Sequence, residues 1–290
     1  MRLLRRTISG ILVRRIIMGT APITVLMSLY KKESPDHLRT ALKSIAKQTL
    51  QPEEVIMILD GPITAPLQQV LSASQAWLPQ LHIYPQATNQ GLGPALAIGV
   101  KLACCELIAR MDTDDIMEAD RLALEYREFE LRAGLDICGS TISEFVEDPA
   151  NIVGRRIVPE TNDEIREFSK RRNPFNHMTV MFKKDAVLKA GNYHSVKSFE
   201  DYELWARMLK QGSEAYNIQK DLVLARTGAD MISRRGGWKY LIEGLGGRYR
   251  VYREGLGNFG DFVFVSGVHI VISVMPGKMR EWFYHKKLRQ

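Results

Sequence analysis

Short apolar runs alternate with helical segments along the first half of the chain. Four runs rich in β-branched residues predict buried strands, at residues 23–29, 55–59, 81–84 and 107–111. Ser34 and Pro35 predict the start of a helix that extends to about residue 47, because serine is a favoured N-cap and proline a favoured first helical residue. Pro52 is expected to separate this helix from the second strand. Two further helices are expected, at about residues 67–73 and 94–102.

Strands that alternate with helices predict parallel βαβ units and an α/β fold class. The strands are continuously apolar, which indicates a sheet covered on both faces. Ligands of such sheets bind beyond the carboxyl ends of the strands. Asp60 and Asp112 each follow a predicted strand directly, so both are expected near a ligand.

The second half of the chain is less regular. Thr161 and Glu164 have the spacing of a capping box and predict a helix that extends to about Lys170. A strand is expected at residues 178–182. A further helix begins near Phe199 and is expected to end at Gly212, a residue type typical of helix C-termini.

The composition is that of an ordinary folded protein. Of 290 residues, 45% are hydrophobic and 25% charged, which excludes global disorder. The three cysteines, Cys104, Cys105 and Cys138, lack the spacing of a zinc site or a disulfide framework. This cysteine usage favours a reducing compartment, and we expect the cytoplasm.

The net charge of +7 is concentrated at the two ends of the chain, where basic and apolar residues are mixed. The basic residues are Arg2, Arg5, Arg6, Arg14 and Arg15 at one end, and Lys278, Arg280, Lys286, Lys287 and Arg289 at the other. The mixture favours an anionic membrane surface over nucleic acid. The apolar stretch 262–275 is shorter than the ~20 residues of a membrane-spanning helix. We therefore expect a peripheral protein on the cytoplasmic face of the inner membrane. The alternative is a terminal core helix followed by a solvated tail.

Three carboxylates follow the fourth predicted strand, at Asp112, Asp114 and Asp115. Like charges this close repel one another, and a cation between them removes the repulsion. Carboxylate oxygens suit Mg²⁺ or Mn²⁺, which keep few protein ligands and bind phosphate. A calcium EF-hand loop does not fit, because Met117 occupies its glycine position. The alternative is that Asp115 or Asp120 only caps the next helix.

The other candidate groups are ambiguous when taken singly. Asn89, Gly91 and Gly93 form a glycine turn, but Leu96 replaces the third small residue of a dinucleotide-binding loop. The turn is equally explained as the start of a helix. Glu200 and Asp201 are equally explained as acidic residues that favour a helix N-terminus.

The order of these motifs resembles glycosyltransferase family 2. The resemblance covers roughly residues 22–227 and rests on Tyr30 and Glu33, Asp60, Asn89 and Gly91, the Asp112–Asp115 string, and Glu200-Asp201 before Leu204-Trp205. Two further strings, Arg110-Met111 before the aspartates and Asn173-Pro174-Phe175-Asn176-His177, are similar to bacterial exopolysaccharide and O-antigen transferases of the amylovoran biosynthesis type.

The resemblance implies a GT-A fold, in which a nucleotide-binding α/β half precedes an acceptor-binding half. It places Tyr30, Glu33 and Asp60 at the base and ribose of the donor, and Asn89, Arg110 and Asp112 among the donor contacts. Asp114, with Asp112 or Asp115, is then expected at Mn²⁺ or Mg²⁺ and the diphosphate. Asp201, or its neighbour Glu200, corresponds to the general base. His177, Arg234 and Arg235 are expected at a diphosphate of the donor or of a lipid-linked acceptor; the alternative is that they are ordinary surface or core residues.

These features predict an inverting, metal-dependent transferase that moves a single sugar. UDP is the favoured nucleotide, and the expected acceptor is a saccharide linked to polyprenyl diphosphate. Two positions depart from the family pattern. Leu59 stands where many relatives carry an aspartate that contributes to the uridine contact. Arg234–Trp238 only loosely resembles the Gln-x-x-Arg-Trp signature of processive synthases, which favours addition of a single sugar.

The expected organisation is a basic extension (1–21), a GT-A domain (22–240) and an amphipathic, membrane-associated segment (241–290). Two alternatives remain. One is a non-catalytic membrane-bound scaffold of the same fold. The other is a dinucleotide-dependent oxidoreductase, against which the missing catalytic Tyr-x-x-x-Lys counts.

Overall fold

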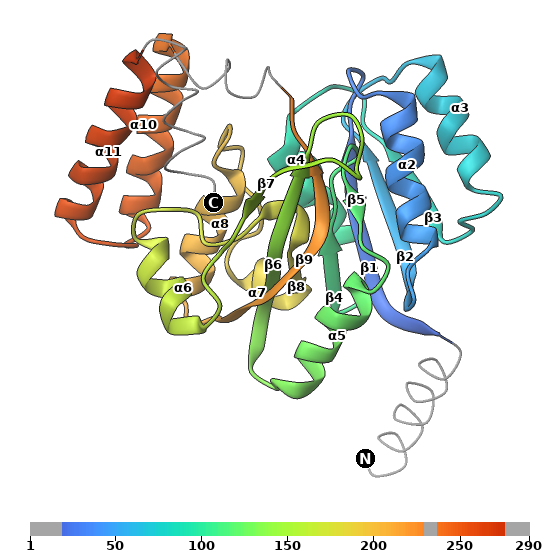
Figure 1. The fold of residues 1–290 in the computed structure, drawn as a ribbon, viewed down its shortest axis with the longest axis horizontal. Helices are drawn as coiled ribbons and strands as arrows, with labels where there is room; N and C mark the ends of the chain where they lie inside the picture. Colours follow the sequence, from blue (N-terminus) through green and yellow to red (C-terminus); the bar gives the residue numbers. More distant parts are fainter. Residues whose placement is uncertain (1–18, 229–236, 276–290) are drawn as a thin grey trace.

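A single mixed sheet organises the protein in the computed structural model, which describes residues 19–228 and 237–275 (Figure 1). Its strands follow the order β3-β2-β1-β4-β8-β6-β9-β5, and β7 pairs with β6. The order divides the sheet into a parallel half built by the first part of the chain and a mixed half built by the second.

The parallel half matches the predicted βαβ pattern. Its elements are β1 (Thr20–Leu29), α2 (Pro35–Ala46), β2 (Gln51–Leu59), α3 (Ala65–Ser74), β3 (Leu81–Pro85), α4 (Leu92–Leu102) and β4 (Leu107–Arg110). β2 and β4 flank β1, β3 lies outside β2, and all four run parallel. Pro52 does not separate α2 from β2 as predicted. It lies inside β2 as the second residue, near the strand start where proline is tolerated.

Alternate side chains of the parallel strands enter two separate cores. Val25 and Met27 of β1 pack with residues of α2 and α3, whereas Leu26 packs with residues of α4. Gly99 of α4 makes that approach possible, because a Cβ there would lie 2.2 Å from a methyl carbon of Leu26. Both faces of these strands are therefore covered, as their continuous apolar sequence predicts.

The mixed half departs from the simple parallel pattern. It contains β5 (Ile116–Met117), α5 (Arg121–Leu131), β6 (Leu135–Phe145), β7 (Ile152–Arg156), α6 (Asn162–Ser169), the 3-10 turn η1 (His177–Thr179), β8 (Met181–Lys183), α7 (Lys184–Lys189), α8 (Glu200–Lys210) and β9 (Glu214–Arg226). β8 joins the two halves by pairing antiparallel to both β4 and β6. The strand predicted at 178–182 is thus mostly wrong: its first residues form η1, where Asn176 accepts the turn hydrogen bond from the Thr179 amide.

Three predicted helix ends are confirmed. The Ser34 hydroxyl accepts from the His37 amide at the start of α2. Thr161 and Glu164 form the full capping box of α6. Gly212 follows α8 with a φ of +91°, a left-handed conformation that favours glycine.

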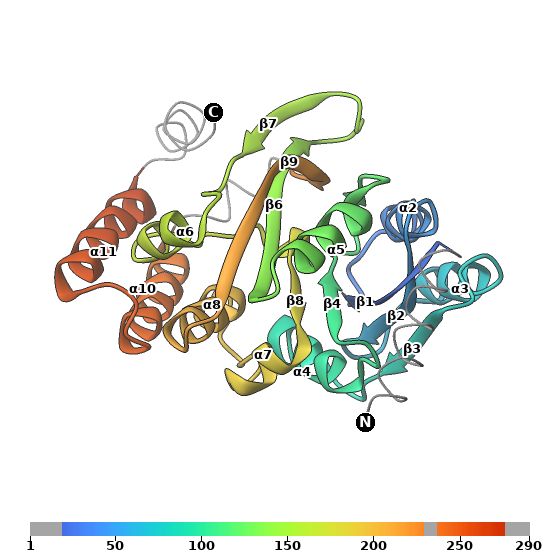
Figure 2. The same cartoon turned by 90° about the horizontal axis from the view of Figure 1, so that it is seen from below.

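Two helices complete the described chain, α10 (Gly237–Arg253) and α11 (Phe259–Val274). They pack against each other as a hairpin beside α8, at one end of the molecule (Figures 1 and 2). No helix within residues 19–228 and 237–275 has the length and apolar character needed to cross a membrane. β1 and α10 begin close to the expected domain boundaries at residues 22 and 240.

Candidate active site

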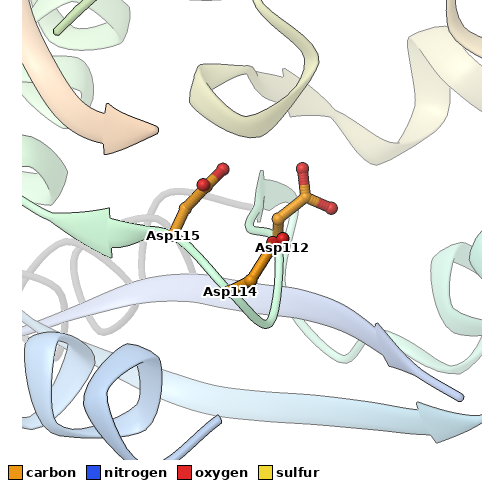
Figure 3. Close-up of side chains that lie close together, drawn as sticks. All are labelled: Asp112, Asp114 and Asp115. Atoms are coloured by element: carbon orange, nitrogen blue, oxygen red, sulfur yellow. The ribbon is translucent and has the colours of Figure 1, made fainter. Parts of the chain in front are cut away.

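A tight turn between β4 and β5 carries the aspartate cluster. β4 ends at Arg110, and β5 begins at Ile116. Within the turn, each of Asp112, Asp114 and Asp115 presents an oxygen, and these oxygens all lie within 4.8 Å of one another. Figure 3 shows the three side chains leaving this one turn. The cluster therefore stands at the carboxyl end of a central strand, where ligands of α/β sheets bind.

Two carboxylates of this turn, Asp114 and Asp115, have raised pKa values. Burial, followed by the charges of Asp112 and Glu33, raises the pKa of Asp114 to about 6. Burial and the charges of Asp112 and Asp114 raise the pKa of Asp115 well above its ordinary value. A cation that contacts these oxygens lowers this cost, and the all-carboxylate donor set fits Mg²⁺ or Mn²⁺.

Arg110 fixes the position of Asp112. Its two terminal nitrogens pair with the two oxygens of Asp112 at 2.5 Å, and the Arg110 side chain is only 2% exposed. The Arg110 carbonyl accepts a hydrogen bond from Arg121, which itself pairs with the buried Glu125. Arg110, predicted as a donor contact, is thus placed behind Asp112, where its bidentate geometry orients that carboxylate.

Arg226 is a neighbour of the cluster that sequence analysis missed. Its amide donates to Asp115 at 2.7 Å, and its guanidinium donates to the carbonyl of Asp114 at 3.1 Å. The guanidinium also lies over the Phe145 ring at 4.5 Å. Arg226 ends β9, so no local motif connects it with the aspartates.

The helix-capping alternative for the aspartates is not realised. Asp120 occupies the N-cap position of α5, but its side chain makes no capping hydrogen bond and pairs with Lys220 instead. Asp115 accepts from Arg226. The clustered aspartates therefore do not serve to start α5.

Glu33 connects the loop after β1 to the aspartate turn. One of its carboxylate oxygens accepts from the Thr113 hydroxyl at 2.8 Å, and the other from the Ser34 amide at 2.7 Å. Tyr30, which was predicted at the same ligand, lies at the end of β1 with its side chain 45% exposed. The structure thus brings the predicted Tyr30 and Glu33 loop beside Asp114.

Asp60 holds the glycine turn in place. Its carboxylate accepts from the amides of Gln90 and Gly91 at 2.7 and 3.0 Å, and the Asn89 side chain donates to its carbonyl at 3.0 Å. Gly91, at a φ of +96°, then caps the start of α4. Asp60 and Asn89 lie together, as predicted, and the turn initiates a helix.

Gly93 brings this turn against the segment that precedes α8. A Cβ at Gly93 would lie 2.3 Å from the carbonyl oxygen of His194 and 3.3 Å from the Cβ of Glu200. No larger residue fits there without moving one of the two chains. The start of α8 is therefore fixed close to the carboxyl edge of the parallel strands.

Of the two acids at the start of α8, Glu200 and Asp201, Asp201 has its carboxylate oriented by hydrogen bonds. Its carboxylate accepts from the Asn173 side chain at 2.6 Å and from the Tyr202 amide at 2.7 Å. Burial raises the pKa of Asp201, and these hydrogen bonds oppose the rise. Burial and the charge of Asp201 raise the pKa of Glu200 to about 7. Asn173 belongs to a string quoted from the sequence, but its role as partner of Asp201 is visible only in the structure.

Glu203, on the same helix, has a structural role. Its carboxylate accepts from Arg207 at 2.7 Å and lies 2.8 Å from Nδ1 of His194. The side chain of Glu203 is buried. Among the acids at the start of α8, Glu200 and Asp201 are therefore the candidates for chemistry.

His177 and Tyr193 are close to the candidate acids, because the charges of Asp112, Glu200 and Asp201 all act on Tyr193. Their side chains share a hydrogen bond of 3.0 Å. Burial, followed by the charge of Arg110, lowers the pKa of His177 well below its ordinary value, so the ring is neutral at pH 7. Burial raises the pKa of the Tyr193 hydroxyl, which also interacts with the charges of Arg110 and Asp201. The predicted contacts Arg234 and Arg235 lie outside the described residues.

Comparisons with known proteins identify the family of this chain. The family model for glycosyl transferase family 2 matches residues 24–191. The amylovoran biosynthesis glycosyltransferase AmsE of Erwinia amylovora is 34% identical over 268 residues, which cover 91% of this chain and 98% of that protein. A UDP-Gal:alpha-D-GlcNAc-diphosphoundecaprenol beta-1,3-galactosyltransferase of Escherichia coli is also 34% identical, over 93% of this chain and 98% of its own length.

Solved structures share the fold at low sequence identity. The mannosyltransferase PcManGT of Pyrobaculum calidifontis, in complex with GDP-Man and Mn²⁺, superposes with a TM-score of 0.63 at 14% identity, over 86% of this chain and 69% of that one. S. aureus TarS in complex with UDP gives a TM-score of 0.62 at 15% identity, over 91% of this chain and 78% of that one. The mixed α/β sheet is thus that of the GT-A fold.

Proposed function

Because this chain belongs to glycosyl transferase family 2, and is a glycosyltransferase rather than an oxidoreductase, we propose the following reaction. The enzyme moves a single sugar from a UDP-sugar, with inversion and with Mn²⁺ or Mg²⁺, to a saccharide on polyprenyl diphosphate, in the synthesis of a bacterial surface polysaccharide. One observation carries the proposal. Two separate groups of carboxylates, at the end of β4 and at the start of α8, both interact electrostatically with Tyr193, which is hydrogen-bonded to His177 and also lies near Arg110.

The first group serves the leaving diphosphate. Asp114 would hold the cation together with an oxygen of Asp112 or Asp115, since Asp112 is oriented by Arg110 and Asp115 by the Arg226 amide. A divalent cation in this place stabilises the negative charge that develops on the leaving diphosphate. Glu33 and Asp60 keep the neighbouring loops at the same edge of the sheet, where the base and ribose are expected.

The second group serves the acceptor. An alcohol is a weak nucleophile at neutral pH, so a carboxylate must take its proton as the new bond forms. Asp201 suits this role because Asn173 and the Tyr202 amide orient it and burial raises its pKa. Attack from this side, opposite to the departing diphosphate, inverts the configuration at the anomeric carbon of the sugar.

One relative supports the proposed donor and acceptor classes. The Escherichia coli relative is described as using UDP-Gal and an acceptor of GlcNAc on diphosphoundecaprenol. We expect this protein to transfer one sugar from a UDP-sugar to a synthetic GlcNAc-diphosphate lipid, with an anomeric configuration opposite to that of the donor. Mass spectrometry of the product counts the sugars added, and NMR coupling constants give the linkage. Retained configuration would contradict the single-displacement mechanism, and a ladder of products would contradict single addition.

The hairpin α10–α11 supports a peripheral membrane location. α11 has its polarity largely inverted: its polar residues face the protein, and most of its apolar residues face outward. The buried polar residues are Asp261, Ser266, His269 and Ser273, and the exposed apolar ones are Phe259, Val263, Phe264, Val268, Ile270, Val271 and Val274. A helix at a water-exposed surface shows the opposite arrangement.

An anionic lipid surface fits this face. At 1.5 Å per residue the 16 residues of α11 extend about 24 Å, which is less than the roughly 30 Å of a bilayer core. α11 is therefore suited to lie in the interface rather than to cross it. Arg250 and Arg253 end the adjacent helix α10, and the sequence beyond residue 275 adds the basic residues named above. Such basic residues favour the headgroups of anionic lipids.

We expect the protein to float with vesicles that contain phosphatidylglycerol at low salt. Replacement of Val263, Phe264 and Val271 by serine should weaken this binding about 10-fold or more, because their apolar surface would no longer leave water. A matched control replaces three exposed leucines elsewhere, Leu102, Leu131 and Leu188, by serine. Wild-type protein that stays in the soluble fraction, or equal losses in both triple variants, would contradict the assignment of this face.

A further inference from the structure

The hairpin also contacts the segment that carries Asp201. We propose that α10 positions Asp201 for catalysis, with Phe199 and Gly247 as the positioning residues, so that sugar transfer depends on this contact whereas donor binding does not. The inference rests on the proposed role of Asp201 as the base. It adds a function for a helix that lies outside the residues 24–191 matched by the family model.

One face of α10 makes the contact, through three residues spaced four apart. Glu243 pairs with Lys197 at 2.8 Å. Gly247 lies against the ring of Phe199. Val251 is buried in a small apolar cluster with Tyr202 and Ala206 of α8. These residues follow one another along the helix, because positions four apart lie on the same face.

Gly247 allows an unusually close approach. A Cβ at this position would lie only 2.3 Å from ring carbons of Phe199, far inside van der Waals contact. Phe199 directly precedes Glu200, and its ring stacks on that of Tyr202, with 6.3 Å between centroids and 24° between planes. The Phe199 ring is thus held between α10 and the Tyr202 ring. Phe199 and Tyr202 lie on either side of Asp201 in the sequence.

The backbone of this segment is held under strain. Ser198 has a φ of +63°, a left-handed conformation that residues other than glycine adopt only at a cost in free energy. Such a conformation persists only where the surrounding contacts enforce it. The contacts of Lys197 and Phe199 with α10 flank this residue directly.

The opposite side of the segment is also fixed. The Tyr202 hydroxyl donates to the carbonyl of Ser169 at 2.6 Å, and Asp201 accepts from Asn173. The first turn of α8 is therefore clamped between α10 and the chain that follows α6. Displacement of Phe199 by an added methyl group shifts Asp201 against Asn173, and an error of about 1 Å in a catalytic group costs up to 10²-fold in rate.

Among the described residues, the hydrogen bonds of the donor side do not reach this clamp, although Gly93 of the glycine turn packs against Glu200. The aspartate turn, Glu33, Asp60 and Arg226 belong to or follow strands of the sheet, and their hydrogen bonds involve neither α10 nor Phe199. A change at Gly247 should therefore leave the affinity for the donor intact. A lower kcat with an unchanged donor affinity would distinguish a positioning role from a general loss of structure.

The test compares two neighbouring glycines of α10. Gly247→Ala meets the Phe199 ring, whereas a Cβ at Gly246 meets nothing within 4 Å. We expect Gly247→Ala to lower kcat about 10-fold or more, with a nearly unchanged donor Kd by calorimetry. Gly246→Ala should behave as wild type. In the Gly247→Ala background, Phe199→Leu should restore part of kcat, because the smaller side chain makes room for the methyl group.

Wild-type turnover of Gly247→Ala would overturn the inference. So would a parallel loss of donor binding, transfer and melting temperature, which indicates a purely structural contact. If Gly247→Ala is not recovered as folded protein, Phe199→Leu alone, which removes the stacked ring, should show the same split between kcat and donor Kd. A fully active Asp201→Asn would instead contradict the assignment of the base, which keeps the two failures distinguishable.

Discussion

Replacement of Asp114 by alanine is expected to remove nearly all activity and to weaken donor binding itself. Asp114 lies at the centre of the acidic cluster, where burial and the charges of Asp112 and Glu33 raise its pKa to about 6. Its loss removes a ligand for the cation that stabilises the leaving diphosphate, and loss of such charge stabilisation costs about 10²-fold or more in rate. Calorimetry with UDP and Mn²⁺, together with a transfer assay, measures both effects.

Asp120→Ala is the matched control. Asp120 lies six positions further along the chain and pairs with Lys220 outside the cluster, so its loss should leave both measurements unchanged. EDTA should abolish wild-type activity, and Mn²⁺ should restore it. Full activity in EDTA, or in the Asp114→Ala variant, would end the metal assignment.

The pH dependence of metal binding follows from the same carboxylates. In the metal-free protein the folded-state pKa of Asp114, about 6, lies above that of an unfolded aspartate, about 3.9. Ionisation therefore destabilises the metal-free fold as the pH rises through this interval, and a bound cation reverses the loss. The rise in melting temperature produced by Mn²⁺ should accordingly be small at pH 5 and large at pH 7, and it should be absent in Asp114→Ala.

Replacement of Asp201 by asparagine is expected to separate catalysis from donor binding. The amide is close in shape to the carboxylate, and its oxygen can still accept from Asn173 and the Tyr202 amide. It cannot take the proton of the acceptor hydroxyl. Transfer should fall by about 10²-fold or more, the usual scale for loss of a positioned base. The donor Kd and the melting temperature should change little.

An aspartate in an equivalent local setting provides the control. Asp185 lies in the first turn of α7 and is exposed, so Asp185→Asn tests the loss of an acid from a helix start without any catalytic geometry. It should transfer sugar at the wild-type rate. If Asp201→Asn does so as well, Asp201 is only a helix-start acid, and Glu200 becomes the candidate base. If every variant at Glu200 and Asp201 is as active as the wild type, both assignments fail.

The sequence by itself determined the parallel half of the fold and the acidic cluster. Strands β1 to β4 and helices α2 to α4 follow from local signals, namely apolar runs, N-cap side chains and prolines, which act over a few residues. The cluster of Asp112, Asp114 and Asp115 was equally predictable, because four consecutive residues cannot lie far apart in any fold. The order of the motifs added the resemblance to the family, and the comparisons confirmed that family.

Tertiary structure alone decided the partners of these groups. Asp115 contacts Arg226, which is 111 positions away, and Asp201 contacts Asn173, which is 28 positions away. The antiparallel pairing of β5 with β9 brings Asp115 beside Arg226, and the antiparallel insertion of β8 between β4 and β6 joins the two halves of the sheet; the sequence predicted neither pairing. The outward apolar face of α11 and the contact of Gly247 with Phe199 likewise depend on which sides of the two helices meet. Local sequence fixes the conformation of a segment, but the packing of distant segments selects which face is buried and which carboxylate receives a partner.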